Sequence, residues 1–344
     1  MVIYMIKKKI NWFLIIFALI SIVTIYSTRS ILPSNLDNIY IKQIFIYLIG
    51  FTIFHLFKNN KLIFKNITII YIISCLLLIL LFFTKPINNA RCWFTIYNLG
   101  TFQPSEFVKI VMVIMTAIIL TKETKYKWFK IVIVFLIPSV LTFLEPDTGL
   151  VIIYAVGVLS VILCYIKKPK KLIIPIILAL ILSILTIILF KNNIHSLRIE
   201  RIINWKNQDG YQLTNALVAI GSNGFKLSFN KINTYFPEAY TDFIFASFAA
   251  SFGYLLTIIF LIFVLYFDLF ILKLAGAEKN RTNKLIIIGF FSMTLYQQVQ
   301  NIGMNLGLLP ITGITFPLVS YGGSSLISYI LILTIIKNMP RKKG

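Results

Sequence analysis

Residues 243–267 read FIFASFAASFGYLLTIIFLIFVLYF, a stretch of 25 residues without a charged side chain. A helix needs about 20 mostly apolar residues to cross the hydrocarbon core of a bilayer. The stretch therefore predicts a membrane span, which we place at 242–272. Backbone polar groups find no water inside a bilayer, so a span of this kind must be helical or part of a closed barrel.

The same pattern recurs along the whole chain of 344 residues. Hydrophobic residues make up 58% and charged residues 13%, and the mean hydropathy is +0.88. A soluble globular protein has about a quarter charged residues, and a disordered one has low hydrophobicity, so both classes are excluded. We predict a single all-α, polytopic membrane domain over 1–344. The ten expected spans are 10–28, 41–57, 66–84, 104–121, 131–145, 149–166, 172–190, 242–272, 285–304 and 315–336. The 131–145 segment is short, which predicts a broken or partial crossing.

Basic residues outnumber acidic ones, 33 to 11, but they lie in short clusters between apolar runs. This placement indicates membrane topology and contacts with anionic lipids, and it argues against a nucleic-acid partner. The side that holds both termini carries 22 Lys and Arg residues and the opposite side carries 10, which predicts that both termini are cytoplasmic. The long loop between spans 7 and 8, about 191–241, then faces outward, and a loop of that length is typically functional.

Metal and disulfide sites are not indicated. Cys75, Cys92 and Cys164 are far apart and lack CxxC spacing, and His55 and His195 are also distant from each other.

Carboxylates at the outer face or inside the membrane are costly, so they usually have a partner or a function. Asp242 precedes Phe243-Ile244-Phe245, an apolar setting that disfavours the charged form and strengthens the carboxylate as a base. A general base that takes a proton from a sugar hydroxyl needs that property. The alternative interpretation is that Asp242 is the N-cap of the following span.

Three further charged residues allow two interpretations. Glu106 and Lys109 are three residues apart after Pro104 and can meet on one helix face; they form either a functional pair or a capping and pairing device. Asp147 follows Pro146 and is either the cap of the next helix or a contact for substrate or an ion.

The segment 309–325 is rich in proline and glycine near a predicted span. Such irregular backbone is expected to line a cavity rather than to face lipid, and its free N–H groups can hold phosphate oxygens. Close helix packing through Gly322 and Gly323 is the alternative.

Four motifs together resemble those of a known family. They are Gln103–Lys109 (QPSEFVK), Glu145–Gly149 (EPDTG), Pro237–Ala246 (PEAYTDFIFA) and Pro317–Ser325 (PLVSYGGSS). Their order and spacing are similar to those of the SEDS family (shape, elongation, division and sporulation), which includes RodA, FtsW and SpoVE, and the resemblance covers nearly the whole chain.

The resemblance implies a peptidoglycan glycosyltransferase with ten spans in the bacterial cytoplasmic membrane. Such a hexosyltransferase polymerises lipid II, which carries undecaprenyl diphosphate, on the outer face. Its usual partner is a class B penicillin-binding protein. A magnesium or manganese ion bound with the substrate diphosphate is compatible with this chemistry.

The family's catalytic aspartate corresponds to Asp242, and Arg201 matches a basic position of the outer loop. The expected substrate-binding residues are Glu106, Lys109, Asp147, Arg201, Glu238, Ser320, Gly322 and Gly323.

The chain departs from the family pattern at Ala250 and Ser251, where two glutamates are usual, and at Cys92, where arginine often precedes the tryptophan. Two other functions stay open. One is a lipid II flippase that uses Glu106, Lys109 and Asp147, and the other is a catalytically silent scaffold of the cell-wall machinery. The sequence does not separate elongation, division and sporulation roles.

Overall fold

The structure is a computed structural model that describes residues 2–33, 36–57, 60–87, 90–96, 100–122, 125–166, 205, 210–225 and 232–339. Its longer helices are α1 (Val2–Ser27), α2 (Ile39–Leu56), α4 (Ile67–Leu81), α5 (Ser105–Thr121), α6 (Lys127–Leu144), α7 (Thr148–Tyr165), α10 (Tyr211–Asn223), α11 (Ile244–Ala277), α12 (Arg281–Asn305) and α13 (Gly323–Lys337). The short elements are η1 (Thr28–Ser30), α3 (Lys61–Lys65) and the antiparallel strands β1 (Phe94–Ile96) and β2 (Gly100–Phe102).

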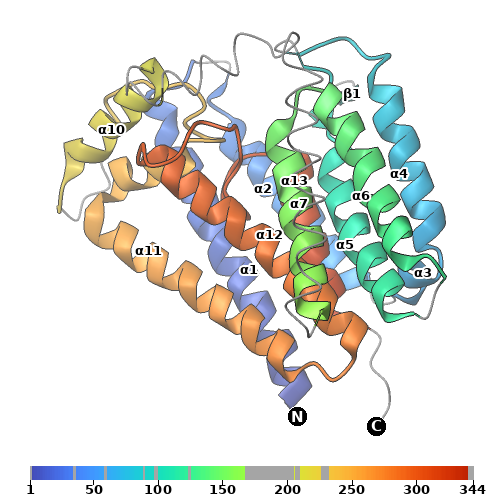
Figure 1. Cartoon of the computed structure of the whole chain (residues 1–344). Coiled ribbons are helices and arrows are strands. Elements are labelled where there is room, and N and C mark those ends of the chain that lie inside the picture. The colour runs from blue at the N-terminus through green and yellow to red at the C-terminus, as the bar shows by residue number, and fades with distance from the viewer. Residues whose placement is uncertain are drawn as a thin grey trace.

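The helices form one bundle (Figure 1), in which the longer helices other than α10 share one apolar core and α10 packs in a second, smaller cluster. Helices α4, α5 and α6 lie along one side, and α11 runs along the opposite side with α10 at one end. Helix α12 lies between them and packs against α7, α5 and α11. Helix α13 packs against α2. This arrangement brings the ends of α1, α12 and the start of α11 to the same end of the bundle as α10.

The prediction of a largely helical chain with several membrane spans is confirmed. By length and composition, five helices of the described ranges can cross a membrane: α1, α2, α6, α7 and α11. Helices α4 and α13 are apolar but shorter. The expected span 172–190 and most of the 191–241 loop lie outside the described residues, so the count of ten spans stays a prediction.

The prediction of a broken crossing at 131–145 is wrong. Helix α6 is one continuous helix of 18 residues. It is longer than the apolar run alone, because it begins at Lys127 and includes the basic residues before that run. It also contains Pro138, which cannot donate a hydrogen bond to the carbonyl of Val134 four residues earlier. The hydroxyl of Tyr71, on α4, lies 3.2 Å from the carbonyl of Ile133 and 3.4 Å from that of Val134, so the neighbouring helix supplies a donor shared by these two carbonyls.

The expected span 315–336 begins too early, because α13 starts only at Gly323. Pro317 has no N–H to donate, and Leu318 has a φ of 63°, which ends regular helix on that side. Side chains from the first two helices hold this irregular backbone in place. The hydroxyl of Tyr47 donates to the carbonyl of Leu318, and Ser21 Oγ donates to the carbonyl of Val319 at 2.6 Å.

Helix α11 begins at Ile244, two residues later than expected, and is kinked at Gly253, where φ is 76° and ψ is 174°. Glycine is the residue that adopts this conformation without a steric penalty. At the kink, the N–H of Tyr254 donates to the carbonyl of Gly224, just after α10, at 2.8 Å. The kink therefore anchors α10 against the first turns of α11.

Candidate active site

Asp242 lies two residues before the start of α11, in a segment that buries every third or fourth residue. Phe236, Ala239 and Phe243 are buried in a small apolar cluster with residues of α10. Glu238 is left exposed and Asp242 half-buried. The N-cap of α11 is Phe243, so the interpretation of Asp242 as the cap of this helix is wrong.

The residues 306–322, which we call the site loop, run directly past this carboxyl group. Gly313 is exposed and has a φ of 70°, and a Cβ built on it would lie 3.5 Å from Asp242 Oδ2. On its other side the site loop contacts Gly149, where a Cβ would lie 3.0 Å from Ile314 Cγ1 and 3.3 Å from the Thr312 carbonyl. The site loop therefore joins the segment of Asp242 to the turn that contains Asp147.

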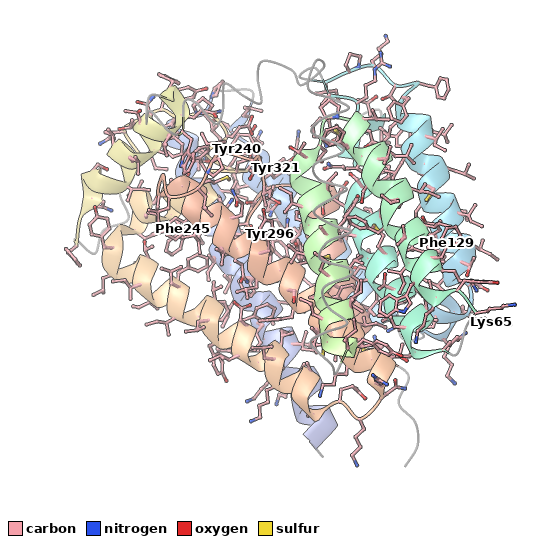
Figure 2. All side chains as sticks on the ribbon, in the orientation of Figure 1. Lys65, Phe129, Tyr240, Phe245, Tyr296 and Tyr321 are labelled. Atoms are coloured by element: carbon pink, nitrogen blue, oxygen red, sulfur yellow. The ribbon has the colours of Figure 1, made fainter. Side chains whose placement is uncertain are left out.

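Ser320 connects the site loop to the segment before α11. Its hydroxyl donates to the carbonyl of Thr241 at 2.6 Å and accepts from the N–H of Phe316 at 2.8 Å. The next residue, Tyr321, donates its N–H to the carbonyl of Tyr240 at 2.9 Å. The two tyrosine rings meet edge to face with centroids 5.7 Å apart, as Figure 2 shows. Burial raises the pKa of Tyr240 to about 12, so this tyrosine stays neutral at physiological pH.

Glu238 forms the turn before Asp242. It has a φ of 56°, and its Oε2 accepts a hydrogen bond from Thr241 Oγ1 at 2.5 Å. Its carbonyl accepts from the N–H groups of Thr241 and Phe243. Glu238 therefore shapes the turn and remains exposed beside Asp242.

Glu106 and Lys109 meet on one face of α5, as their spacing predicts. Lys109 Nζ lies 2.5 Å from Glu106 Oε2, and both side chains are buried. Ser328 Oγ, on α13, donates to the same carboxylate at 3.3 Å. Lys109 Nζ also lies 4.1 Å from the centre of the Tyr329 ring. Helix α13 thus encloses the ion pair and stabilises both charges.

Asp147 is the N-cap of α7, which confirms that interpretation. Its Oδ1 accepts from the N–H of Leu150 at 3.1 Å, and its Oδ2 accepts from Gln103 Nε2 at 2.9 Å. Burial raises the pKa of Asp147 to about 6, and these two hydrogen bonds oppose the rise. The N–H of Gln103 in turn donates to Ser324 Oγ, so this turn also contacts the start of α13.

Glu145, two residues earlier, is a buried carboxyl group whose oxygens have no hydrogen-bond partner among the described residues. Burial, with a smaller contribution from Asp147, raises its pKa to about 8. It is therefore largely protonated at neutral pH.

Gly322 and Gly323 open α13 and are half-exposed. A Cβ on Gly322 would meet nothing nearer than Ser325 Cβ at 3.7 Å, and one on Gly323 nothing nearer than Ile46 Cδ1 at 3.9 Å. By contrast, a Cβ on Gly50 would lie 2.2 Å from Ile330. The interpretation of Gly322 and Gly323 as close packing contacts is therefore wrong, because a Cβ at either position would make only ordinary van der Waals contacts.

The family model described as "Cell cycle protein", which groups FtsW, RodA and SpoVE, matches residues 8–344. This chain belongs to that family. Among its curated relatives is the probable peptidoglycan glycosyltransferase FtsW of Buchnera aphidicola subsp. Baizongia pistaciae, 34% identical over 322 residues, which are 86% of this chain and 82% of the relative. The corresponding FtsW of Bacillus subtilis is 34% identical over 295 residues, which are 78% of this chain and 72% of the relative.

Solved structures share the FtsW, RodA and SpoVE fold. A chain of a peptidoglycan synthase complex superposes with a TM-score of 0.81 at 23% identity, covering 98% of both chains. RodA of Thermus thermophilus superposes with a TM-score of 0.70 at 23% identity, covering 98% of this chain and 97% of RodA.

Two departures from the FtsW, RodA and SpoVE pattern have packing roles here. Ala250 is buried in the apolar cluster beneath Asp242, and Ser251 Oγ donates to Ser27 Oγ of α1 at 2.8 Å. Arg201 lies outside the described residues.

Sequence reasoning missed Gly313 and the two asparagines Asn301 and Asn305, whose side chains donate to the carbonyl of Asp242. A signal was present: Gln297, Asn301 and Asn305 recur every fourth residue in an apolar span, which places three amides on one helix face.

Proposed function

We propose that this protein is a peptidoglycan glycosyltransferase that polymerises lipid II, with Asp242 as the general base. The observation that carries the proposal is the half-buried carboxyl group of Asp242 beside the exposed, side-chain-free backbone of Gly313. The protein also belongs to a family whose curated relatives are named peptidoglycan glycosyltransferases. An open space next to a carboxylate is what a sugar hydroxyl needs in order to reach its base.

In the proposed reaction, the acceptor hydroxyl transfers its proton to Asp242 as its oxygen attacks the anomeric carbon of the donor. The bond from that carbon to the diphosphate breaks, and undecaprenyl diphosphate leaves with the bonding electrons. An in-line attack inverts the anomeric centre. The leaving group carries negative charge, which N–H dipoles and cations stabilise.

The N–H groups of Gly322 and Gly323 are proposed to hold the diphosphate, because a helix N-terminus favours anions and both glycines at the start of α13 are half-exposed. Arg201 is proposed as a cation that assists the leaving group. Glu238 is proposed to contact the sugar from the exposed turn, and Ser320 to hold Thr241 and thereby the neighbouring Asp242. Asp147 and the ion pair of Glu106 and Lys109 are proposed to border the substrate on the α5 side.

A divalent cation fits this site only together with the substrate. The described residues contain no group of three or more His, Cys, Asp or Glu side chains arranged to hold a metal. Asp242 alone would supply a carboxylate, and substrate phosphate oxygens and water would supply the other ligands, as is common for magnesium.

We further propose ten spans with both termini in the cytoplasm and the site outside. Ser30 Oγ donates to the carbonyl of Ile232, so the segment before α11 lies at the end of α1. The opposite end of α1 follows the basic residues near the N-terminus, which favour the cytoplasm. The apolar side chains exposed on α11, among them Ile258, Ile262 and Leu265, would face membrane lipids or a helix of a class B penicillin-binding protein.

The test is polymerisation of labelled lipid II by the purified protein with its penicillin-binding partner. We expect glycan chains from the wild type and none from Asp242→Asn. Asp37→Asn is the matched control, because Asp37 is an exposed acid at the same end that pairs with Arg29 at 4.0 Å. Glycan chains made by Asp242→Asn would refute the role of Asp242 as the general base. If the wild type makes no glycan chains with magnesium or manganese, the result favours a catalytically silent scaffold. If it moves lipid II across liposome membranes without forming polymer, the result favours a flippase.

A further inference from the structure

The first hydrogen bond of α11 runs from the N–H of Ser247 to the carbonyl of its N-cap Phe243 at 3.0 Å, and the bond that would extend the helix by one more residue is not formed. In an α-helix the N–H of each residue donates to the carbonyl four residues earlier, which would pair Ala246 with Asp242. Instead, the N–H of Ala246 donates to Asn305 Oδ1 at 2.9 Å, and the carbonyl of Asp242 accepts from Asn305 Nδ2, also at 2.9 Å. The side-chain amide of Asn305, on α12, therefore binds both the N–H and the carbonyl that would otherwise pair with each other.

Asn301, one turn earlier on α12, completes this arrangement. Its Nδ2 donates to the carbonyl of Asp242 at 2.8 Å and to the carbonyl of Ile314, in the site loop, at 2.8 Å. The carbonyl of Asp242 therefore has two donors, which is its full capacity. Asn301 and Asn305 are both fully buried, so water does not substitute for them.

We propose that Asn305, supported by Asn301, is a positioning residue that keeps Asp242 outside α11 and directs its carboxyl group toward the site loop. The inference rests on the proposed role of Asp242 as the base. Its physical basis is that an amide offers a donor and an acceptor on one planar group, whereas a carboxylate only accepts and alanine does neither.

Without the amide of Asn305, the N–H of Ala246 loses its partner and the carbonyl of Asp242 keeps only the bond from Asn301. These two groups satisfy each other if the helix begins one residue earlier, since unpaired buried backbone groups are strongly disfavoured. This change gives Phe243 helical φ and ψ and is expected to displace the neighbouring Asp242 side chain relative to Gly313.

The first measurement is the polymerisation rate at saturating lipid II. We expect Asn305→Ala to lower kcat about 10- to 100-fold with little change in KM, as a misplaced catalytic group does. Gln300→Ala is the matched control. Gln300 is a buried amide on the same helix and donates to the carbonyl of Pro310 in the same site loop at 2.9 Å, without contacting Asp242. We expect it to retain kcat within about threefold, since it leaves the catalytic group in place.

The second measurement reports position without activity. It uses Asp242→Cys combined with Cys164→Ser, because Cys164 is exposed whereas Cys75 and Cys92 are buried. The bonds from Asn301 and Asn305 go to the backbone of residue 242, so the cysteine keeps them. We expect Asn305→Ala to change the reaction rate of this cysteine with a charged methanethiosulfonate reagent at least fivefold, and Gln300→Ala to leave it unchanged.

Asn301→Ala is the second variant if Asn305→Ala does not fold, because it removes one of the two donors to the carbonyl of Asp242 and leaves both bonds of Asn305 in place. It should lower kcat in the same way. Equal losses of kcat in the Asn305 and Gln300 variants, or an unchanged labelling rate, would overturn the proposal. Activity of Asp242→Asn would instead refute the base, while the labelling experiment would still decide the positioning role.

Discussion

Removal of one partner of the buried ion pair on α5 should cost far more stability than removal of both. Lys109→Met leaves the carboxylate of Glu106 buried without its cation, and breaking a buried pair in this way costs about 3–5 kcal/mol. Most of this loss of stability comes from the ion pair, in which Lys109 Nζ lies 2.5 Å from Glu106 Oε2, and part comes from the lost contact between Lys109 and the Tyr329 ring. The double variant Glu106→Gln with Lys109→Met has no charge to bury and should lie within about 1–2 kcal/mol of the wild type.

The assay is unfolding of the purified protein in detergent, followed by heat or denaturant. Arg29→Met is the matched control, because Arg29 forms an exposed pair with Asp37 at 4.0 Å, and such surface pairs contribute below about 1 kcal/mol. A double variant as unstable as Lys109→Met would refute the electrostatic reasoning. The double variant should nevertheless fail to polymerise lipid II, and full activity would show that the pair is structural only.

Three other changes test the rest of the site. The pKa of Glu145 is raised to about 8 and that of Asp147 to about 6, so the folded state holds protons that the unfolded state releases. The free energy of unfolding should therefore fall as pH rises from about 4.5 to 8. In Glu145→Gln the fall should end near pH 6, as melting curves across this range will show. Gly322→Ala should fold normally yet polymerise lipid II poorly. Gly289→Ala is the contrasting variant: its Cβ would lie 2.6 Å from Val113, so it should lose about 1–3 kcal/mol of stability. Unfolding and polymerisation measured on both variants distinguish a loss of activity from a loss of stability. Gly313→Ala should lower kcat, because it places a methyl group beside the carboxyl group of the proposed base Asp242 and strains a backbone with φ 70°; an unchanged kcat would contradict the proposed position of the substrate.

The helical segments could be predicted from the sequence because hydrophobicity is a local property of each stretch. The error at 315–322 arose because that segment is equally apolar but is held in an irregular form by distant side chains. Gln43 Nε2 donates to Ser21 Oγ at 2.9 Å and to the carbonyl of Ser320 at 3.2 Å. No local pattern reports that residues near 21 and 43 supply partners to residues near 320. The break at Pro317 was visible in the sequence, but its consequence depended on the tertiary fold.

The site shows the same division. The motif around Asp242 identified the carboxylate, and helical spacing alone placed Glu106 beside Lys109. The sequence did not show that Asp242 lies outside α11, because the amide of Asn305 that replaces the first helical bond comes from another helix. The interpretation of Asp242 as a cap followed the local rule for helix starts, and a tertiary contact overrides that rule here.

The choice of side chains around Asp242 follows from the low dielectric of the setting. The groups that hold its backbone and the site loop are neutral amides and hydroxyls, namely Asn301, Asn305 and Ser320, and each is buried and hydrogen-bonded. Neutral groups with satisfied hydrogen bonds are tolerated where an unpaired charge is strongly destabilising. A charged side chain in the same supporting position would compete with Asp242 for protons and alter its strength as a base. A variant that introduces a charge at this buried position, such as Asn305→Asp, should therefore impair folding as well as catalysis.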